Sequence, residues 1–176
     1  VTTRTAGFAS ISQSGLTNGS KLLASMLMII GGSPAGTAGG IKTTTVAVLL
    51  LTAISVLRGN KDTECYGRKI TFEIIRVGIT ITLVTFVFWL FGVTVMTVIE
   101  PQQKVLDLMF EATSAMATVG LTADLTPVLS DISHVVLMLM MYIGRIGPMT
   151  MALIFSGHVD KKNQFRTLPE AKIMVG

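Results

Sequence analysis

The feature that most constrains this chain is an apolar stretch over residues 77–99, 23 residues without a charged side chain. As a helix it would reach about 34 Å, which is enough to cross a bilayer with a little tilt. Only 14% of the residues are charged, whereas a soluble domain has roughly a quarter. We therefore expect an all-α membrane protein, which excludes a water-soluble globule, a disulfide scaffold and a disordered tail.

Three further apolar stretches differ from this simple span. Residues 132–157 form a second long candidate, but Arg145 lies inside it between two glycines. Residues 105–117 would rise only about 20 Å as a helix, which predicts a re-entrant segment. Residues 22–57 are too long for one straight span and contain a glycine- and proline-rich segment, which predicts a break at membrane depth. That segment consists of Gly31, Gly32, Ser33, Pro34, Ala35, Gly36, Thr37, Ala38, Gly39 and Gly40.

The basic residues indicate which side of the membrane each connection faces. Lys and Arg gather in residues 58–76 and from residue 158 onward, whereas residues 100–131 hold one Lys against five acidic residues. Because cytoplasmic loops carry an excess of Lys and Arg, we expect the first two regions inside and the third outside. The prediction is a multi-pass protein of the cell membrane, in contact with the lipid bilayer and not with nucleic acid. From its polar start we also expect the chain to begin inside a longer protein.

A short motif occurs twice at an offset of 113 residues. Parallel repeats of this kind indicate membrane units arranged around a shared axis. The two copies are Thr5-Ala6-Gly7-Phe8 and Thr118-Val119-Gly120-Leu121, and the same offset pairs Met28 with Met141, Ile30 with Ile143, Gly31 with Gly144 and Thr37 with Thr150.

A Thr-x-Gly stretch after a re-entrant helix predicts a cation filter. Non-helical backbone at membrane depth must be buried or line a watery cavity, and rings of carbonyl oxygens replace the water shell of K⁺ or Na⁺. The helix aims its negative end at the same place, and we expect Asp107, Glu111 and Asp124 to raise the cation concentration at the outer mouth. An ordinary turn is the competing interpretation. The predicted ligands are the backbone carbonyls of Thr5, Ala6, Gly7, Thr118, Val119 and Gly120.

Residues 2–8, 31–42, 117–122 and 144–148 resemble the potassium-translocating subunits of the Ktr, Trk and HKT superfamily. The resemblance implies repeated M1-P-M2 units, each a helix, a re-entrant pore helix, a filter strand and a helix, around one pore. It makes residues 1–69 the end of the third unit, with its filter strand, its broken M2 helix and a cytoplasmic loop. Residues 70–160 would form the fourth unit, and residues 161–176 a cytoplasmic tail.

The resemblance also implies a mechanism and partners. K⁺ would be transported through a channel-like pore, with Na⁺ as a candidate coupling or activating ion, and residues 31–40 would be an intramembrane gating loop. Glycine at every filter position goes with K⁺ preference in that family. The implied partners are the missing N-terminal units of the same polypeptide, a second copy in a homodimer, and cytoplasmic nucleotide-binding regulatory subunits of the RCK type. Residues 58–76 and the tail are the candidate docking surfaces.

Two basic residues have both a structural and a functional interpretation. Lys42 and Arg145 could snorkel to the membrane surface. A charge in mid-span, however, usually lines a cavity or is paired. We therefore expect them to form an electrostatic barrier on the inner side of the filter.

Other functional classes explain fewer of the residues. An ion-coupled secondary transporter with discontinuous helices also accounts for the break, but it usually needs an intramembrane carboxylate, which the long spans lack. The spacing of Gly32, Gly36 and Gly40 also suits close helix packing. A nucleotide-binding P-loop requires Gly directly before Lys, where this chain has Ile41. No convergent set of nucleophile, base or metal ligands indicates an enzyme.

Overall fold

The structure is a computed structural model that describes residues 2–9, 12–33, 39–59, 62–65 and 68–146. Helices dominate this part of the chain. They are α1 (Asn18–Ile29), α2 (Thr43–Leu57), α3 (Phe72–Ile99), α4 (Val105–Met116) and α5 (Asp131–Ile146). The shorter elements are the π-helical turn η1 (Thr2–Ala6), the 3-10 turns η2 (Gln13–Gly15) and η3 (Thr126–Val128), and a hairpin of β1 (Glu64–Cys65) and β2 (Arg68–Lys69).

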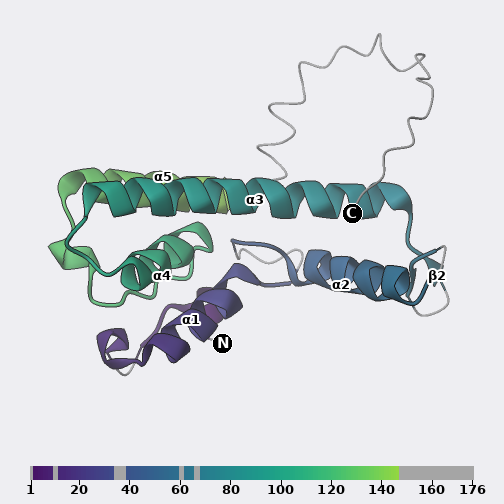
Figure 1. Cartoon of the computed structure of the whole chain (residues 1–176), viewed down its shortest axis with the longest axis horizontal. Coiled ribbons are helices and arrows are strands. Elements are labelled where there is room, and N and C mark those ends of the chain that lie inside the picture. The colour runs from purple at the N-terminus through teal and green to yellow at the C-terminus, as the bar shows by residue number, and fades with distance from the viewer. Residues whose placement is uncertain (1, 10–11, 34–38, 60–61, 66–67, 147–176) are drawn as a thin grey trace, which may run out of the picture.

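Helix α3 extends along the described part of the molecule and packs against α2, α4 and α5, whereas α1 packs against α4. Helix α3 is the one helix of the described residues that is long and apolar enough to cross a membrane, by length and composition. Figure 1 shows α5 alongside α3, with α4 and α1 beneath one half and α2 beneath the other. Large apolar side chains such as Val87, Phe91 and Val98 remain exposed on α3, as expected of a helix that faces lipid.

The predicted helices are confirmed where the structure describes them. Helix α3 covers residues 77–99, α4 matches residues 105–117 to within one residue, and α1 and α2 are separated at the predicted break. Helix α1 begins four residues before the predicted start because Thr17 caps it, its side-chain oxygen accepting the backbone N–H of Ser20 at 3.3 Å. Helix α5 confirms the predicted stretch as far as Ile146, and residues 147–157 lie outside the described part.

Helix α4 is the buried centre of the described molecule. Every residue from Phe110 to Ala117 is buried. Helix α5 can approach closely because of its glycine Gly144, where an added Cβ would lie 1.9 Å from the carbonyl oxygen of Met116. The C-terminal end of α4 is therefore enclosed, and it leads directly into the second Thr-x-Gly motif.

Two polar links hold the helix ends in place. In the first turns of α1 and α4, Lys21 Nζ lies 2.6 Å from Asp107 Oδ1. After α3, the Glu100 carboxylate accepts the backbone N–H of Ser130 at 2.8 Å and the hydroxyl of Ser133 at 3.0 Å. The hydrogen bonds from Ser130, followed by that from Ser133, lower the pKa of Glu100. The ionised carboxylate thus ties the end of α3 to the start of α5, where a negative charge is favourable.

Candidate functional site

The two Thr-x-Gly motifs, 113 residues apart in the sequence, meet in space. Gly7 and Gly120 both have left-handed backbones, with φ of 66° and 88°. A Cβ added to Gly7 would lie 2.6 Å from the carbonyl oxygen of Val119 and 3.4 Å from the Cα of Gly120. Glycine is the residue that adopts this backbone without a steric cost and also permits so close an approach. The structure thus brings the two predicted filter segments to one place.

Each motif begins within a turn that is closed by a backbone hydrogen bond spanning five residues. The Gly7 N–H donates to the carbonyl of Thr2 at 3.3 Å, and the Val119 N–H donates to the carbonyl of Ser114 at 2.9 Å. The first bond closes the π-helical turn η1, whereas the second, together with the bond from the Thr118 N–H to the carbonyl of Ala115, forms a Schellman ending of α4 with Thr118 as its left-handed residue. The backbone before Gly7 is therefore a helical turn, where an extended strand was predicted, while residues 119–123 have no regular structure.

A cavity of about 290 Å³ opens between the two motifs and one acidic side chain. The carboxylate of Asp124 borders it and accepts a hydrogen bond from the Ser12 hydroxyl. Hydrogen bonds from Ser12, followed by those from Ser14, lower the pKa of Asp124, so this carboxylate is ionised at neutral pH. A fixed negative charge beside a cavity favours a cation there. The lining residues are Gly7, Ala9, Ser12, Gln13, Gly120, Leu121, Thr122 and Asp124.

Glu111 does not lie at the cavity mouth, so the expectation that it raises the local cation concentration is wrong. It is 4% exposed, and its carboxylate accepts hydrogen bonds from the Thr122 hydroxyl, the Ala123 N–H at 3.0 Å and the Thr126 hydroxyl at 3.1 Å. A buried carboxylate is tolerated because these donors replace water. Glu111 therefore fixes the loop that follows the second motif to the helix that precedes it.

Asp107 is also absent from the lining of this cavity. Its carboxylate pairs with Lys21, whose side chain is 7% exposed. Sequence reasoning missed Lys21, although one signal was present. A lysine in the first turn of a helix faces the positive end of the helix dipole, and such a position indicates an acidic partner nearby.

The two described ends of the glycine-rich segment pair with each other. The Gly31 N–H donates to the carbonyl of Ile41 at 2.8 Å, the Ile41 N–H to that of Ile29 at 3.1 Å, and the Thr43 N–H to that of Gly32 at 3.2 Å. We call the two segments that contain these pairs, residues 29–32 and 39–43, the neck. The predicted gating-loop residues Pro34, Ala35, Gly36, Thr37 and Ala38 lie outside the described part, and Ser33 directly follows the first side of the neck.

The neck rests on the backbone that enters the second motif. The Gly39 N–H donates to Thr118 Oγ1 at 3.1 Å. A Cβ added to Gly39 would lie 2.6 Å from that oxygen and 2.9 Å from the carbonyl oxygen of Ala117. With Gly144 of α5 packed on Met116, residues 116–118 are held between the neck and α5.

Lys42 and Arg145 belong to segments that meet at this end of α4. Lys42 is in the neck and directly precedes α2, and Arg145 is in the last described turn of α5, next to Gly144. The side chain of Arg145 is exposed. Gly147 and Pro148, which complete the predicted motif, lie outside the described residues.

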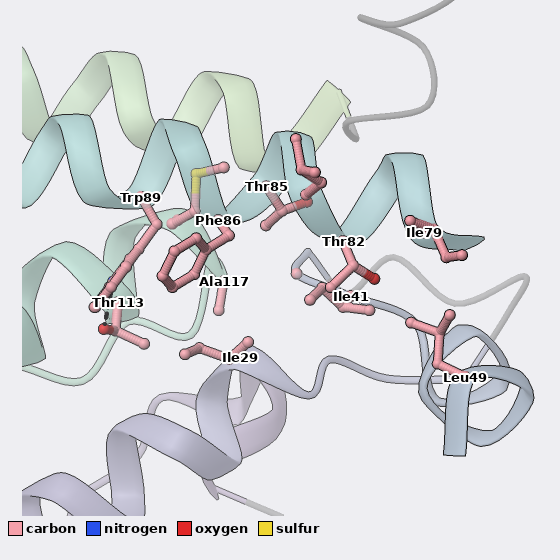
Figure 2. Close-up of a pocket in the computed structure, with 13 residues that line it drawn as sticks. Ile29, Ile41, Leu49, Ile79, Thr82, Thr85, Phe86, Trp89, Thr113 and Ala117 are labelled. Atoms are coloured by element: carbon pink, nitrogen blue, oxygen red, sulfur yellow. Dashed lines mark hydrogen bonds between the residues drawn. The ribbon is translucent and has the colours of Figure 1, made fainter. Parts of the chain in front are cut away.

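A second cavity, of about 440 Å³, lies between α3, the end of α4 and the neck (Figure 2). Its lining is almost entirely apolar and comes from α3, α4, Leu49 of α2 and the neck residues Ile29, Gly40 and Ile41. Trp89 reaches from α3 to α4, where its Nε1–H donates to Thr113 Oγ1 at 2.9 Å. The neck is therefore packed tightly against Thr118 through Gly39, whereas Gly40 and Ile41 border the cavity.

Comparisons with known proteins identify similar sequences over the whole chain. A family model described as TrkH, cation transport protein, matches residues 1–166. The chain is 36% identical over 176 residues to the Ktr system potassium uptake protein B of Bacillus subtilis, covering 100% of the chain and 39% of that protein. It is 36% identical over 179 residues to the potassium/sodium uptake protein NtpJ of Enterococcus hirae, covering 100% of the chain and 40% of that protein. The Ktr system potassium uptake protein B of Vibrio alginolyticus is 34% identical over 153 residues, covering 87% of the chain and 33% of that protein. The chain thus spans two fifths or less of the length of these relatives.

Proposed function

Because this chain belongs to the TrkH family of cation transport proteins, we propose that it forms part of a channel-like pathway that carries K⁺ across a cell membrane. The membership confirms the resemblance drawn from the motifs, and the family is one of transport proteins and not of enzymes. The choice of K⁺ is supported by the names of the relatives, which describe potassium uptake. Na⁺ is proposed as a second ion because one relative is named for potassium and sodium uptake.

The meeting of Gly7 and Gly120 is the observation that supports this function most strongly. In the proposed pathway, K⁺ sheds its water between the two motifs and is held by peptide oxygens of Thr5, Ala6, Gly7, Thr118, Val119 and Gly120, together with further strands. Carbonyl oxygens suit this task because they replace the hydration shell without a full charge, so the ion can leave again. The cavity beside Asp124 provides the entrance, where the carboxylate raises the local cation concentration.

The order of the described elements supports two M1-P-M2 units. We propose that residues 70–160 form one unit, since α3, the short buried α4, the second motif and α5 follow one another in that order. Residues 1–69 would supply the first motif and the broken helix of the preceding unit, and residues 161–176 a cytoplasmic tail. In this multi-pass arrangement α4 is the pore helix, and the negative end of its dipole points toward the filter.

The glycine-rich segment and two basic residues are proposed to control the inner half of the pathway. Residues 31–40 act as the gating loop, and Lys42 and Arg145 act as a positive barrier to cations. The backbone positions of both basic residues at the end of α4 support this role. For regulation we propose homodimerisation and cytoplasmic nucleotide-binding subunits of the RCK type that dock on residues 58–76, a partnership in keeping with relatives named as parts of a Ktr system.

Replacing Gly120 tests the proposed filter. In the intact protein, produced in cells that lack other K⁺ uptake systems, Gly120→Ser should lower the ratio of K⁺ to Na⁺ uptake, because a side chain at φ of 88° strains the backbone that presents the carbonyls. The measurement is the uptake of each ion from media of matched ionic strength.

Gly19→Ser is the matched control, since a Cβ at Gly19 meets no atom within 4 Å. This variant should keep the K⁺ preference of the unaltered protein. A Gly120→Ser protein that is present in the membrane at normal levels and retains full K⁺ preference would contradict the filter assignment.

A further inference from the structure

The residue between α4 and the second glycine has an unusual backbone. Thr118 has a φ of 53°, in the left-handed region that a β-branched residue rarely adopts. A strained backbone of this kind persists only where surrounding contacts hold it, and such residues gather at functional and switching sites. The contacts that hold Thr118 therefore show what its conformation depends on.

Thr118 is held by backbone hydrogen bonds on one side and by the neck on the other. Its N–H donates to the carbonyl of Ala115 at 3.0 Å, which continues the end of α4. Its hydroxyl oxygen accepts the Gly39 N–H at 3.1 Å, across 79 residues of sequence. Gly39 has no room for a Cβ, because Oγ1 of Thr118 would be only 2.6 Å away. The neck and the second motif are thus joined by a specific donor and acceptor.

The neck can transmit a displacement to Thr118 because its two segments are hydrogen-bonded to each other. Gly31 and Ile41 are hydrogen-bonded, so Gly39 moves with both sides of the neck. The apolar cavity of about 440 Å³ borders Gly40 and Ile41 of the neck and also Ala117, the residue before Thr118, so there is unfilled space beside both. Close packing resists small shifts, whereas empty space permits them.

We propose that Thr118 is a positioning residue for ion selectivity: its hydroxyl, by binding the Gly39 amide, makes the K⁺ preference of the second motif depend on the position of the neck. The inference rests on the proposed function, because it assumes that residues 118–120 select the ion. It assigns to the Thr118 side chain a role distinct from that of its carbonyl. The hydroxyl acts on the neck and not on the ion.

The test compares two substitutions at one position in the intact protein. Thr118→Val keeps the shape and the β-branch but removes the acceptor, whereas Thr118→Ser keeps the hydroxyl. We expect Thr118→Val to lower the ratio of K⁺ to Na⁺ uptake by about threefold to tenfold, the effect of losing one hydrogen bond on an equilibrium. Thr118→Ser should stay within about twofold of the unaltered protein, since the bond remains.

Hydrogen exchange at the Gly39 amide reports the bond itself. Measured by mass spectrometry on purified protein, exchange should be faster in Thr118→Val and unchanged in Thr118→Ser. Lost selectivity with unchanged Gly39 exchange would overturn the proposal, because the hydroxyl would then act on the ion. Faster exchange with unchanged selectivity, or equal losses in both variants, would also overturn it. None of these outcomes contradicts the proposed filter, which is tested separately by the ion preference of Gly120→Ser.

A second variant keeps the test decisive if Thr118→Val does not fold. Gly39→Ala pushes a methyl group against Thr118 Oγ1 from the neck side, so it should lower the K⁺ preference in the same direction. Gly19→Ala, at a position with no atom within 4 Å of the added Cβ, is its matched control. Gly39→Ala protein with unaltered selectivity would overturn the proposal.

Discussion

At the residue scale, Glu111 shows how a buried charge can serve the backbone beside it. Both carboxylate oxygens are used, one by the Thr122 hydroxyl and the Ala123 N–H and the other by the Thr126 hydroxyl. The loop after the second motif has no regular structure of its own, so these bonds supply the acceptors that a sheet or helix would otherwise provide. The conformation of that loop therefore depends on one side chain of α4.

Substitutions at Glu111 should separate hydrogen bonding from charge. Glu111→Gln keeps an oxygen for Thr122 and Ala123 and offers an amide to the Thr126 oxygen, so it should unfold at nearly the same temperature. Glu111→Met leaves buried donors unsatisfied at about 1–3 kcal/mol each and should lower the midpoint by about 5 °C or more. The measurement is thermal unfolding of the intact protein in detergent. Equal destabilisation by both variants would show that the charge matters and that the acceptors do not.

At the scale of elements, α1 and α4 are joined by the ion pair of Lys21 and Asp107. The two side chains are 7% and 20% exposed, and their charged atoms are 2.6 Å apart. A pair this enclosed is costly to break, because the remaining charge is left without a partner. The pair therefore fixes the position of α4 against the helix that follows the first motif.

Exchanging the two charges should restore the stability that each single substitution removes. Lys21→Asp and Asp107→Lys each place like charges together and should destabilise the protein by about 3 kcal/mol. The double variant recreates the attraction, and its two changed helix-dipole contributions have opposite signs. Unfolding midpoints of the four proteins give the coupling energy directly. Additive losses in the double variant would show that the pair contributes nothing.

The helices were predictable from sequence and their mutual contacts were not. Residues 77–99 and 105–117 are apolar runs, and glycines with Pro34 interrupt residues 22–57, so local composition predicts these elements. The bond from Gly39 to Thr118 and the pair of Lys21 with Asp107 join residues 79 and 86 positions apart. Periodicity reports only neighbours within a few residues, and it therefore carries no signal for such pairs. For the same reason Glu111 was expected at the surface.

At the scale of the whole molecule, α3 separates basic from acidic connections. Its 28 residues extend about 42 Å, with the hairpin of Arg68 and Lys69 at one end and the loop that begins at Glu100 at the other (Figure 1). This separation supports the proposed orientation, with the hairpin in the cytoplasm. A cation that leaves the motifs would then travel toward the end that carries the positive charges.

The proposed electrostatic barrier at Arg145 acts on the path of the ion through the whole molecule. Arg145→Ala should raise K⁺ flux about fivefold, because removing a positive charge near the path lowers the electrostatic barrier by about 1 kcal/mol, and Arg145→Lys should retain the original flux. Electrical recordings from the intact protein in planar bilayers measure both. Lys104→Ala, which removes an exposed charge from the loop between α3 and α4, is the control. Unchanged flux in Arg145→Ala would exclude the barrier.

The unequal surroundings of the two glycines have a consequence for the ion itself. Gly7 follows a π-helical turn that packs against α1, whereas Gly120 lies two residues after Thr118, which is hydrogen-bonded to Gly39. In a pore made of four identical subunits, sideways forces on a central ion cancel by symmetry. Here they would not cancel, so an ion between these two motifs would rest off the geometric axis of the pore.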